Sequence, residues 1–390
     1  MKVAISRCSS YEEEKLEKAL DEALDFLGGL ENFISPGMKV LLKVNLLTAK
    51  SPEKAVTTHP EFVKILCRKI KRLGAVPWVG DSSGGILPNQ NPTARSLEVS
   101  GIEAMALEEG VRVVNFDRFG AMKVDNPDNS IFPHVYLAKP IFEADLVISL
   151  PKFKTHGLTV FTGGVKNMFG AVPGSLKRDY HSRAPRMKDF ARILADIYHL
   201  TSPSLTIMDG ILAMEEDGPS GGSPRELGLI LASTDGVSLD EAAVEIAGLS
   251  PGEIPTSKIA GELGYGISDR DKIHVPGKLN DWKVMNFQPP KNPMVFANYM
   301  PGFIVGPLMN QLKTLPDVNE AKCTSCRICV DSCPVEAVYI NEKAKINWNA
   351  CIECLCCHEL CPQKAIKLTP KGILSKLAFG FMNLKRTFFS

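Results

Sequence analysis

The sequence predicts an α/β domain, with a largely parallel sheet and flanking helices, followed by a small α+β domain built around cysteines. Strand-like and helix-like segments alternate from residue 1 to about residue 275, which is typical of the first architecture. Nine of the eleven cysteines lie between Cys323 and Cys361, which indicates a separate unit. We expect an α/β domain at 1–275, a Pro- and Gly-rich linker at 276–319, the small domain at 320–368 and an apolar, basic tail at 369–390.

The elements of the first domain follow in chain order. Val3 and Ile5 predict a first strand, and the capping-box spacing of Ser10 and Glu13 predicts a helix that ends at Gly28. Apolar runs predict buried strands at Met38–Leu47, Ala75–Val79, Val111–Phe116, Asp145–Leu150, Leu205–Met208 and Leu227–Leu231. Helices are expected at residues 60–73 and 93–109, and from Ser238 onward with Glu241 in the capping position.

Composition and charge exclude several classes of protein. With 45 basic and 44 acidic residues the formal net charge is +1, and no basic run interleaves with aromatic residues, so nucleic-acid binding is not expected. Arg7 interrupts the N-terminus too early for a signal peptide. The uncharged segment 292–312 is broken by prolines and glycines, so we expect a packed linker rather than a membrane span. These observations favour a cytoplasmic location.

Two runs of cysteines share one spacing, C-x2-C-x2-C-x3-C followed by proline. This is the spacing of bacterial two-cluster ferredoxins, in which the fourth cysteine of each run binds the cluster of the other run. The expected ligands of the first [4Fe-4S] cluster are Cys323, Cys326, Cys329 and Cys361, and those of the second are Cys351, Cys354, Cys357 and Cys333.

The alternative interpretation of these cysteines is a structural zinc site. Zinc sites usually show CxxC pairs separated by a spacer, so the repeated four-cysteine runs favour iron–sulfur clusters. Cys356 falls between expected ligands and is predicted not to bind iron, and Cys8 and Cys67 are interpreted as ordinary buried thiols. The module is expected to pass electrons to or from the α/β domain, and a redox partner protein is expected as well.

Polar residues follow several predicted strands of the first domain. In a parallel sheet the carboxyl ends of the strands converge on one edge, where ligands bind. Four lysines and two histidines give this edge a positive field, so we expect an anionic ligand, a carboxylate or a phosphate. The glycine-rich segments 80–85 and 163–164 are expected to offer backbone N–H groups. The candidate ligand-binding residues are Lys43, Asn45, His59, Ser82, Lys152, Lys154 and Asn167.

Asp81, His156 and Lys166 are the candidate catalytic residues of this edge. Asp81 and His156 suit an acid/base pair or a metal site. Structural alternatives stay open for several positions. His59 stands in a possible capping box from Thr58 to Glu61, Asp240 in the first turn of a helix, and the acidic segment 215–217 either binds a cation or is an exposed loop.

Five segments in order resemble the motif series of the DUF362 family: Lys43–Leu47, Thr57–Pro60, Gly80–Gly85, Leu150–His156 and Gly163–Gly170. That family is often joined to a ferredoxin-type module. The resemblance covers about residues 1–275, and the ferredoxin resemblance covers about residues 320–368. The resemblance to the DUF362 family implies the fold and the fusion of the two units rather than a particular reaction.

Three hypotheses about function remain. In the first, the clusters exchange electrons with an anionic ligand held by the α/β domain, as in a reductase. In the second, the protein delivers electrons to, or assembles with, another protein that contacts the apolar segments 292–312 and 372–390. In the third, the α/β domain performs acid/base chemistry and the clusters are structural. Peripheral membrane contact through 372–390 is an alternative to packing of this tail on the cysteine module.

Overall fold

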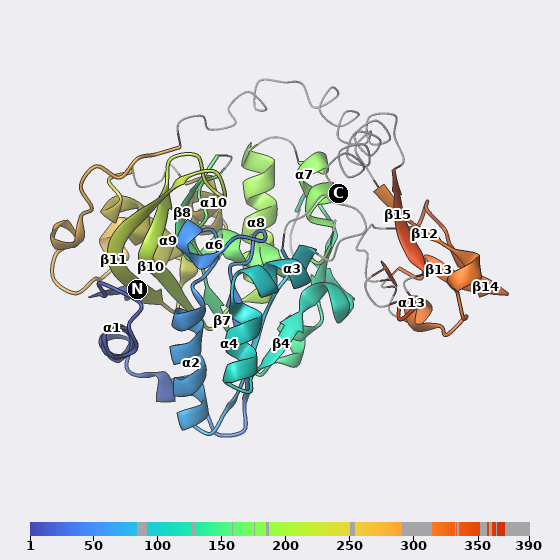
Figure 1. Cartoon of the computed structure of the whole chain (residues 1–390). Coiled ribbons are helices and arrows are strands. Elements are labelled where there is room, and N and C mark those ends of the chain that lie inside the picture. The colour runs from blue at the N-terminus through green and yellow to red at the C-terminus, as the bar shows by residue number, and fades with distance from the viewer. Residues whose placement is uncertain are drawn as a thin grey trace, which may run out of the picture.

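The computed structural model contains a large α/β unit and a small β-rich unit (Figure 1). It describes residues 1–83, 92–126, 130–157, 159–174, 176–184, 187–249, 254–290, 314–331, 333, 335–351, 357–358, 361–363 and 365–370. Among these residues, the sheet of the large unit has nine strands, with the order β1-β11-β10-β7-β2-β3-β4 and with β8 and β9 attached to β10. The strands are β1 Ala4–Arg7, β2 Lys39–Val44, β3 Val76–Asp81, β4 Arg112–Asn115, β7 Leu146–Leu150, β8 Lys152–His156, β9 Val160–Phe161, β10 Leu205–Glu215 and β11 Ser223–Ser233.

The centre of this sheet is parallel, as predicted. Strands β10, β7, β2, β3 and β4 run in the same direction, whereas β11 is antiparallel to both β10 and β1. Pro151 separates β7 from β8, which continues along β10 and places Lys152 opposite Asp209. The carboxyl ends of these strands therefore meet at one edge, which positions the candidate site.

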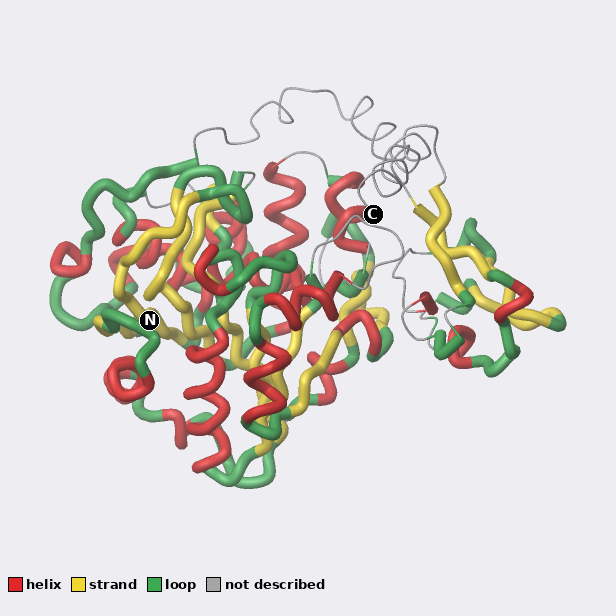
Figure 2. The backbone as a smooth tube through the Cα atoms, in the orientation of Figure 1, coloured by secondary structure: helices red, strands yellow, loops and turns green. Residues whose placement is uncertain are grey.

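Helices cover both faces of the sheet (Figure 2). They are α1 Glu13–Phe26, α2 Pro60–Arg72, α3 Pro92–Val99, α4 Ile102–Glu108, α5 Pro140–Glu143, α6 Gly163–Asn167, α7 Leu176–Arg183, α8 Met187–Thr201, α9 Gly236–Ile246 and α10 Pro255–Glu262. Because side chains alternate along a strand, Leu42 packs with α1, α2 and α4 on one face. Leu41 and Val147 pack with α6 and α8 on the other face.

Several predicted boundaries are wrong. Helix α1 begins after Glu12 and has no side-chain cap, so Ser10 and Glu13 form no capping box. Helix α9 begins at Gly236 and is capped by Asp235 rather than by Ser238, and the helix expected at 93–109 is interrupted at Gly101. The hairpin of β5 Ala121–Asp125 and β6 His134–Ala138 was not predicted. Asp235 caps α9 through the N–H groups of Val237 and Ser238, and Gly101 adopts a positive φ of 78° where the expected helix breaks.

The small unit contains two short sheets. Strand β12 Thr314–Val318 pairs with β15 Ile366–Pro370, and β13 Val338–Asn341 pairs with β14 Lys343–Ile346. Helix α13 Ile328–Asp331 carries Cys329, which joins Cys357 in the apolar core of the unit. The pairing of β12 extends this unit to residue 314, inside the segment expected to be a linker.

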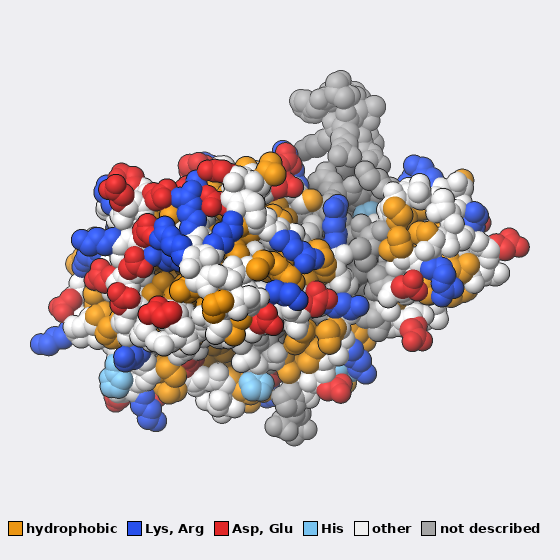
Figure 3. Space-filling view, turned by 90° about the horizontal axis from the view of Figure 1, so that it is seen from below, with side chains coloured by type: hydrophobic (Ala, Val, Ile, Leu, Met, Phe, Trp, Pro, Cys, Tyr) orange, Lys and Arg blue, Asp and Glu red, His pale blue; other side chains and the backbone are white. Residues whose placement is uncertain are grey.

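The first part of that expected linker belongs to the α/β unit. Phe287 is buried and packs edge to face on Phe153 of β8, with ring centroids 5.6 Å apart. In the part of the chain that the structure describes, no helix combines the length and the apolar composition needed to cross a bilayer. On the face drawn in Figure 3, acidic and basic side chains are interspersed.

Candidate functional site

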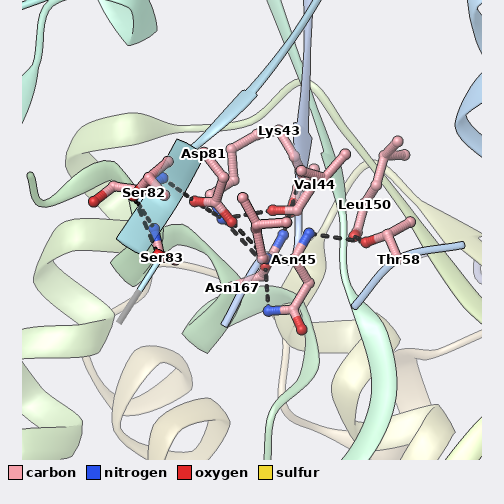
Figure 4. Close-up of polar contacts among 12 residues, drawn as sticks. Lys43, Val44, Asn45, Thr58, Asp81, Ser82, Ser83, Leu150 and Asn167 are labelled. Carbon is pink, nitrogen blue, oxygen red and sulfur yellow. Dashed lines mark hydrogen bonds and ion pairs between the residues drawn. The ribbon is translucent and has the colours of Figure 1, made fainter. Parts of the chain in front are cut away.

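A buried ion pair lies where strands β2 and β3 end (Figure 4). Lys43 Nζ is 2.8 Å from Asp81 Oδ1, and both side chains are almost completely buried. The Asp81 carboxylate also accepts the backbone N–H groups of Leu46 and Ser82, each at 2.8 Å. Gly170 lies so close that a Cβ there would be 2.1 Å from Asp81 Oδ1. A glycine is therefore needed at 170 to fit against the pair.

Two asparagines extend this group. Asn167, at the end of α6, accepts hydrogen bonds at its Oδ1 from Lys43 Nζ at 3.2 Å and from Asn45 Nδ2 at 3.0 Å. Its Nδ2 donates to Ser149 Oγ at 3.0 Å. Asn45 Oδ1 is buried and has no hydrogen-bond partner among the described residues. The structure thus brings together four predicted site residues, 43, 45, 81 and 167, and leaves one buried acceptor for a ligand.

A second ion pair lies between β8 and β10. Lys152 Nζ is 2.7 Å from Asp209 Oδ2, and both side chains are fully buried. The hydroxyl of Tyr11 donates to Asp209 Oδ1 at 2.7 Å and accepts from Lys152 Nζ at 2.9 Å. Sequence analysis missed Tyr11, because it precedes α1 and no local pattern connects it with a strand end.

His59 belongs to this second group and also starts a helix. Its Nδ1 accepts the backbone N–H of Glu61 at 3.2 Å, so His59 itself is the N-cap of α2. Its backbone N–H donates to Asp209 Oδ2 at 3.0 Å, and its ring stacks on Tyr11 with centroids 3.6 Å apart. Burial lowers the pKa of His59 to about 4, so the ring is neutral at pH 7. Its capping role favours the structural interpretation of this residue.

Lys154 is buried without a carboxylate partner in the described chain. It is 1% exposed, and its Nζ donates to the carbonyl oxygen of Val56 at 2.6 Å. Burial, followed by the nearby charge of Lys166, lowers its pKa well below the ordinary lysine value. Desolvation of an ammonium group costs several kcal/mol, roughly, when no counter-ion repays it. The energetic cost of Lys154 is therefore typical of a functional group rather than of a structural ion pair.

Lys166 and Lys177 add two more amines. Lys166 is partly buried, and neither a hydrogen bond nor an ion pair engages its Nζ within the described ranges. Burial, followed by the charges of Lys43 and Lys177, lowers its pKa to about 8. Lys177 Nζ donates to Ser82 Oγ at 2.6 Å, and burial lowers its pKa to about 8. Lys177 was not predicted, because it lies on α7 rather than after a strand.

The two histidines near Lys166 are neutral. Burial, followed by the charge of Lys166, lowers the pKa of His156 well below its ordinary value and that of His181 to about 3. His156 Nδ1 accepts the backbone N–H of Thr159 at 3.2 Å. Asp81 is held by Lys43 and by backbone N–H groups, whereas the charges that act on His156 are those of lysines and His181. The predicted pairing of Asp81 with His156 stays a prediction.

In the described part of the glycine-rich segments, side chains of the protein already accept several of the N–H groups that we expected a ligand to use. The Asp240 carboxylate of α9 accepts from Gly164 N at 2.6 Å and from Val165 N at 3.1 Å. Asp240 therefore caps α6, and its interpretation as a charge compensating its own helix is wrong. In the other segment, Ser83 N donates to Thr93 Oγ1 at 2.9 Å, while Gly84 and Gly85 lie outside the described residues.

The acidic segment 215–217 makes protein contacts. Glu215 Oε2 accepts the backbone N–H of Gln288 at 3.0 Å, and Glu216 Oε2 accepts from Ser223 Oγ at 2.8 Å. These contacts favour a structural role over the cation site that the sequence left open.

In the small unit, the four cysteines expected to bind the first cluster line one pocket. These are Cys323, Cys326, Cys329 and Cys361, and apolar side chains such as Ile340 complete the lining. Cys361 comes from the second run, which matches the exchange of ligands predicted from the spacing. Thiolates in an apolar lining are the donors that iron–sulfur clusters require, so the residues present fit the group.

The second set of cysteines shows a matching environment. Cys333, Cys351 and Cys357 are described, and Cys354 lies outside the described residues. Ala337 N donates to Cys333 Sγ, and Ala365 N donates to Cys361 Sγ, each at 3.2 Å and each four residues after its cysteine. Equivalent N–H···S bonds in both runs indicate an internal repeat, and such bonds tune cluster potentials.

The fold and the cysteine-lined pocket define an iron–sulfur protein in which a [4Fe-4S] ferredoxin-type domain follows an α/β domain with a lysine-rich edge. Its sequence matches the family model "Domain of unknown function (DUF362)" over residues 40–245 and the model "4Fe-4S dicluster domain" over residues 315–362. The chain belongs to the DUF362 family. This membership and the fused cluster domain confirm the architecture predicted from the motifs.

Two comparisons with individual proteins add to this. The chain is 37% identical, over 263 residues, to the thylakoid-associated protein sll1697 of Synechocystis sp., covering 67% of this chain and 79% of that protein. Among solved structures, it resembles the lactate racemase apoprotein from Thermoanaerobacterium thermosaccharolyticum, with 13% identity and a TM-score of 0.39. That match covers 65% of this chain and 57% of the other chain.

Proposed function

We propose that two [4Fe-4S] clusters exchange electrons with an anionic ligand or cofactor bound at the lysine-rich edge of the α/β domain. The observation that carries the proposal is the unbalanced charge at this edge. Lys43 and Lys152 have carboxylate partners, whereas Lys154 and Lys166 have none among the described residues. A bound carboxylate or phosphate would supply the missing counter-charge, and a hydroxyl on it would suit the unpartnered Asn45 Oδ1.

Contacts between the two units support the electron-transfer part of the proposal. Val335 follows Cys333 by two residues and packs against the apolar cluster of the α/β unit that includes Phe169 and Leu176. Phe169 follows α6 and Leu176 begins α7, the two helices that carry Lys166 and Lys177. A residue two positions after Cys333 thus contacts the α/β unit, which supports a path for electrons between the two units.

The proposal is tested by reoxidation of reduced clusters. Anaerobically purified protein is reduced with dithionite, freed of excess reductant, and mixed with the small-molecule fraction of an anaerobic cell extract. We expect the visible absorbance of the oxidised clusters to return rapidly in the wild type and slowly in Lys154→Met. Both proteins should contain the same amount of iron per chain. Equal rates in the two proteins would contradict the proposal, because the amine site would then play no part. Rapid turnover would make the protein an oxidoreductase.

We also propose that the protein associates peripherally with a membrane. The similarity to a thylakoid-associated protein favours this. Residues 372–390 combine seven leucine or phenylalanine residues with the basic residues Lys376, Lys385 and Arg386. Basic residues among large apolar ones suit an anionic lipid surface. The full chain should sediment with anionic vesicles at low salt and be released at high salt, and a chain ending at residue 371 should stay in solution. Equal sedimentation of both chains would contradict this role of the tail.

A further inference from the structure

Lys166 differs from the other buried lysines of the site in having an unengaged amine. The Nζ groups of Lys43 and Lys152 form ion pairs, that of Lys154 donates to a backbone carbonyl, and that of Lys177 donates to Ser82. No such contact holds Lys166 Nζ in the described chain, and its side chain is only partly buried. A bound molecule would therefore not have to break an existing interaction to contact this amine.

The position of Lys166 is nevertheless fixed. Helix α6 is held at its start by the Asp240 carboxylate, which accepts from Gly164 and Val165. At its end, Asn167 hydrogen-bonds to Lys43 and to Ser149. Residues on both sides of Lys166 are thus anchored, so the amine is presented from a backbone that cannot shift freely. A fixed nucleophile reacts faster than a mobile one because its orientation is set in advance.

The charged groups around Lys166 are cations or neutral rings. Lys43 of β2 and Lys177 of α7 act on it directly, and it acts in turn on Lys154 and His156 of β8 and on His181 of α7. The carboxylate of Asp81 at this edge is paired with Lys43. Burial and neighbouring cations together lower the pKa of Lys166 to about 8. About a tenth of the amine is then neutral at pH 7, far more than for an ordinary lysine with a pKa of about 10.4.

We propose that Lys166 forms an imine with an aldehyde or ketone that also carries a carboxylate or phosphate group. This inference rests on the proposed function, because the anionic group is the one held by the neighbouring amines. The neutral Nζ attacks the carbonyl carbon, and the resulting carbinolamine loses the former carbonyl oxygen, with two protons, as water. The C=O bond is replaced by a C=N bond, and no oxidant or reductant is consumed. Activation of a lysine by desolvation and adjacent cations is an established route to such chemistry.

The experiment uses pyridoxal 5′-phosphate, an aldehyde with a phosphate group, as the probe. Full-length, anaerobically purified protein is incubated with it and with cyanoborohydride, which fixes imines as stable amines, and the labelled peptides are identified by mass spectrometry. We expect Lys166 to be labelled at least tenfold faster than the exposed Lys18 and Lys123, and sulfate to slow this labelling. The labelling rate at residue 166 should rise up to about pH 8 and then level off. Labelling of Lys166 no faster than of Lys18 and Lys123 would overturn the inference.

A second measurement separates this inference from the proposed function. Sulfate binding is measured by calorimetry on the wild type and on Lys166→Arg, which keeps the charge but cannot form the imine. If Lys166 is not labelled selectively while sulfate still binds to both proteins, the imine is refuted and the anion site stands. If sulfate neither binds nor protects, the anion site fails as well. Loss of the label at residue 166 in Lys166→Arg, with sulfate binding retained, is the result that we expect.

Discussion

Replacing Lys154 with methionine should make the protein more stable, whereas the same replacement of Lys43 should make it less stable. Both lysines are almost completely buried, but Lys43 has a carboxylate partner 2.8 Å away and Lys154 has only the carbonyl oxygen of Val56. Methionine has a similar length and no charge, so each replacement removes an ammonium group and leaves the packing nearly unchanged.

The magnitudes follow from the partners. Replacing a buried ion pair by apolar residues of similar volume is often stabilising by about 1–4 kcal/mol, and we expect the same range for a lone buried ammonium group. Loss of the hydrogen bond to Val56 costs about 1 kcal/mol, so Lys154→Met should be between about 0 and 3 kcal/mol more stable. Lys43→Met leaves the Asp81 carboxylate buried without its cation, which costs about 3–5 kcal/mol. The two variants should therefore differ by at least about 3 kcal/mol.

The advantage of Lys154→Met should depend on pH with a definite sign. Burial lowers the pKa of Lys154 in the folded protein, so the folded state binds fewer protons at this site than the unfolded chain does. Raising the pH therefore favours the folded wild type, and the advantage of the variant should shrink between pH 7 and about 10, the ordinary range of a lysine.

The assay is urea unfolding of the α/β domain, followed by far-UV circular dichroism under anaerobic conditions at pH 7 and pH 9. Lys154→Met should unfold at a higher urea concentration than the wild type, and Lys43→Met at a lower one. Destabilisation of Lys154→Met by an amount comparable to Lys43→Met would refute the reasoning. Lys154 would then be a structural residue rather than one retained for binding.

Three further predictions concern the site and the clusters. The affinity of the protein for sulfate should fall as pH rises from 7 to 9, by up to about tenfold for each of Lys166 and Lys177. Both pKa values are about 8, so the ammonium form that attracts sulfate is lost above this pH. A constant affinity in calorimetry would contradict the lowered pKa values. Gly170→Ala should disrupt the buried ion pair and lower the free energy of unfolding in urea by more than Gly110→Ala does. At Gly110 a Cβ meets nothing within 4 Å, so only the positive φ lowers stability, by about 1–2 kcal/mol. An equal loss of stability in both variants would refute the close packing at Gly170. Cys361→Ser should lower the iron content from about eight to about four atoms per chain, because the lost cluster is the one bound by the first cysteine run. Loss of the cluster bound by the second run alone would contradict the exchange of ligands.

The sequence predicted the part of the site that strand ends determine. Lys43 and Asp81 lie at the carboxyl ends of β2 and β3, and Lys152 comes just after β7. Such positions of a parallel sheet converge whatever the details of packing. Asn167 was found because the motif around it was rich in small and polar residues. The first three cysteines of each run were predicted from their short, fixed spacing, whereas the exchange of Cys333 and Cys361 was predicted from the resemblance of both runs to two-cluster ferredoxins.

Residues that reach the site from other elements were missed. Tyr11 comes from the segment before α1 and contacts Lys152 and Asp209, which lie 141 and 198 residues later in the sequence. Asp240 was misinterpreted because its partners, Gly164 and Val165, belong to another helix. Contacts of this kind are determined by tertiary packing, and no local pattern of residue types identifies them.

We propose above all that this chain carries two [4Fe-4S] clusters able to exchange electrons. Electron paramagnetic resonance of the anaerobically purified protein, before and after dithionite, together with iron analysis on the same sample, tests it most directly. We predict about eight iron atoms per chain, a silent oxidised state and the complex signal of two interacting reduced clusters. A colourless protein that contains zinc, or one that shows no paramagnetic signal after reduction, would contradict the account.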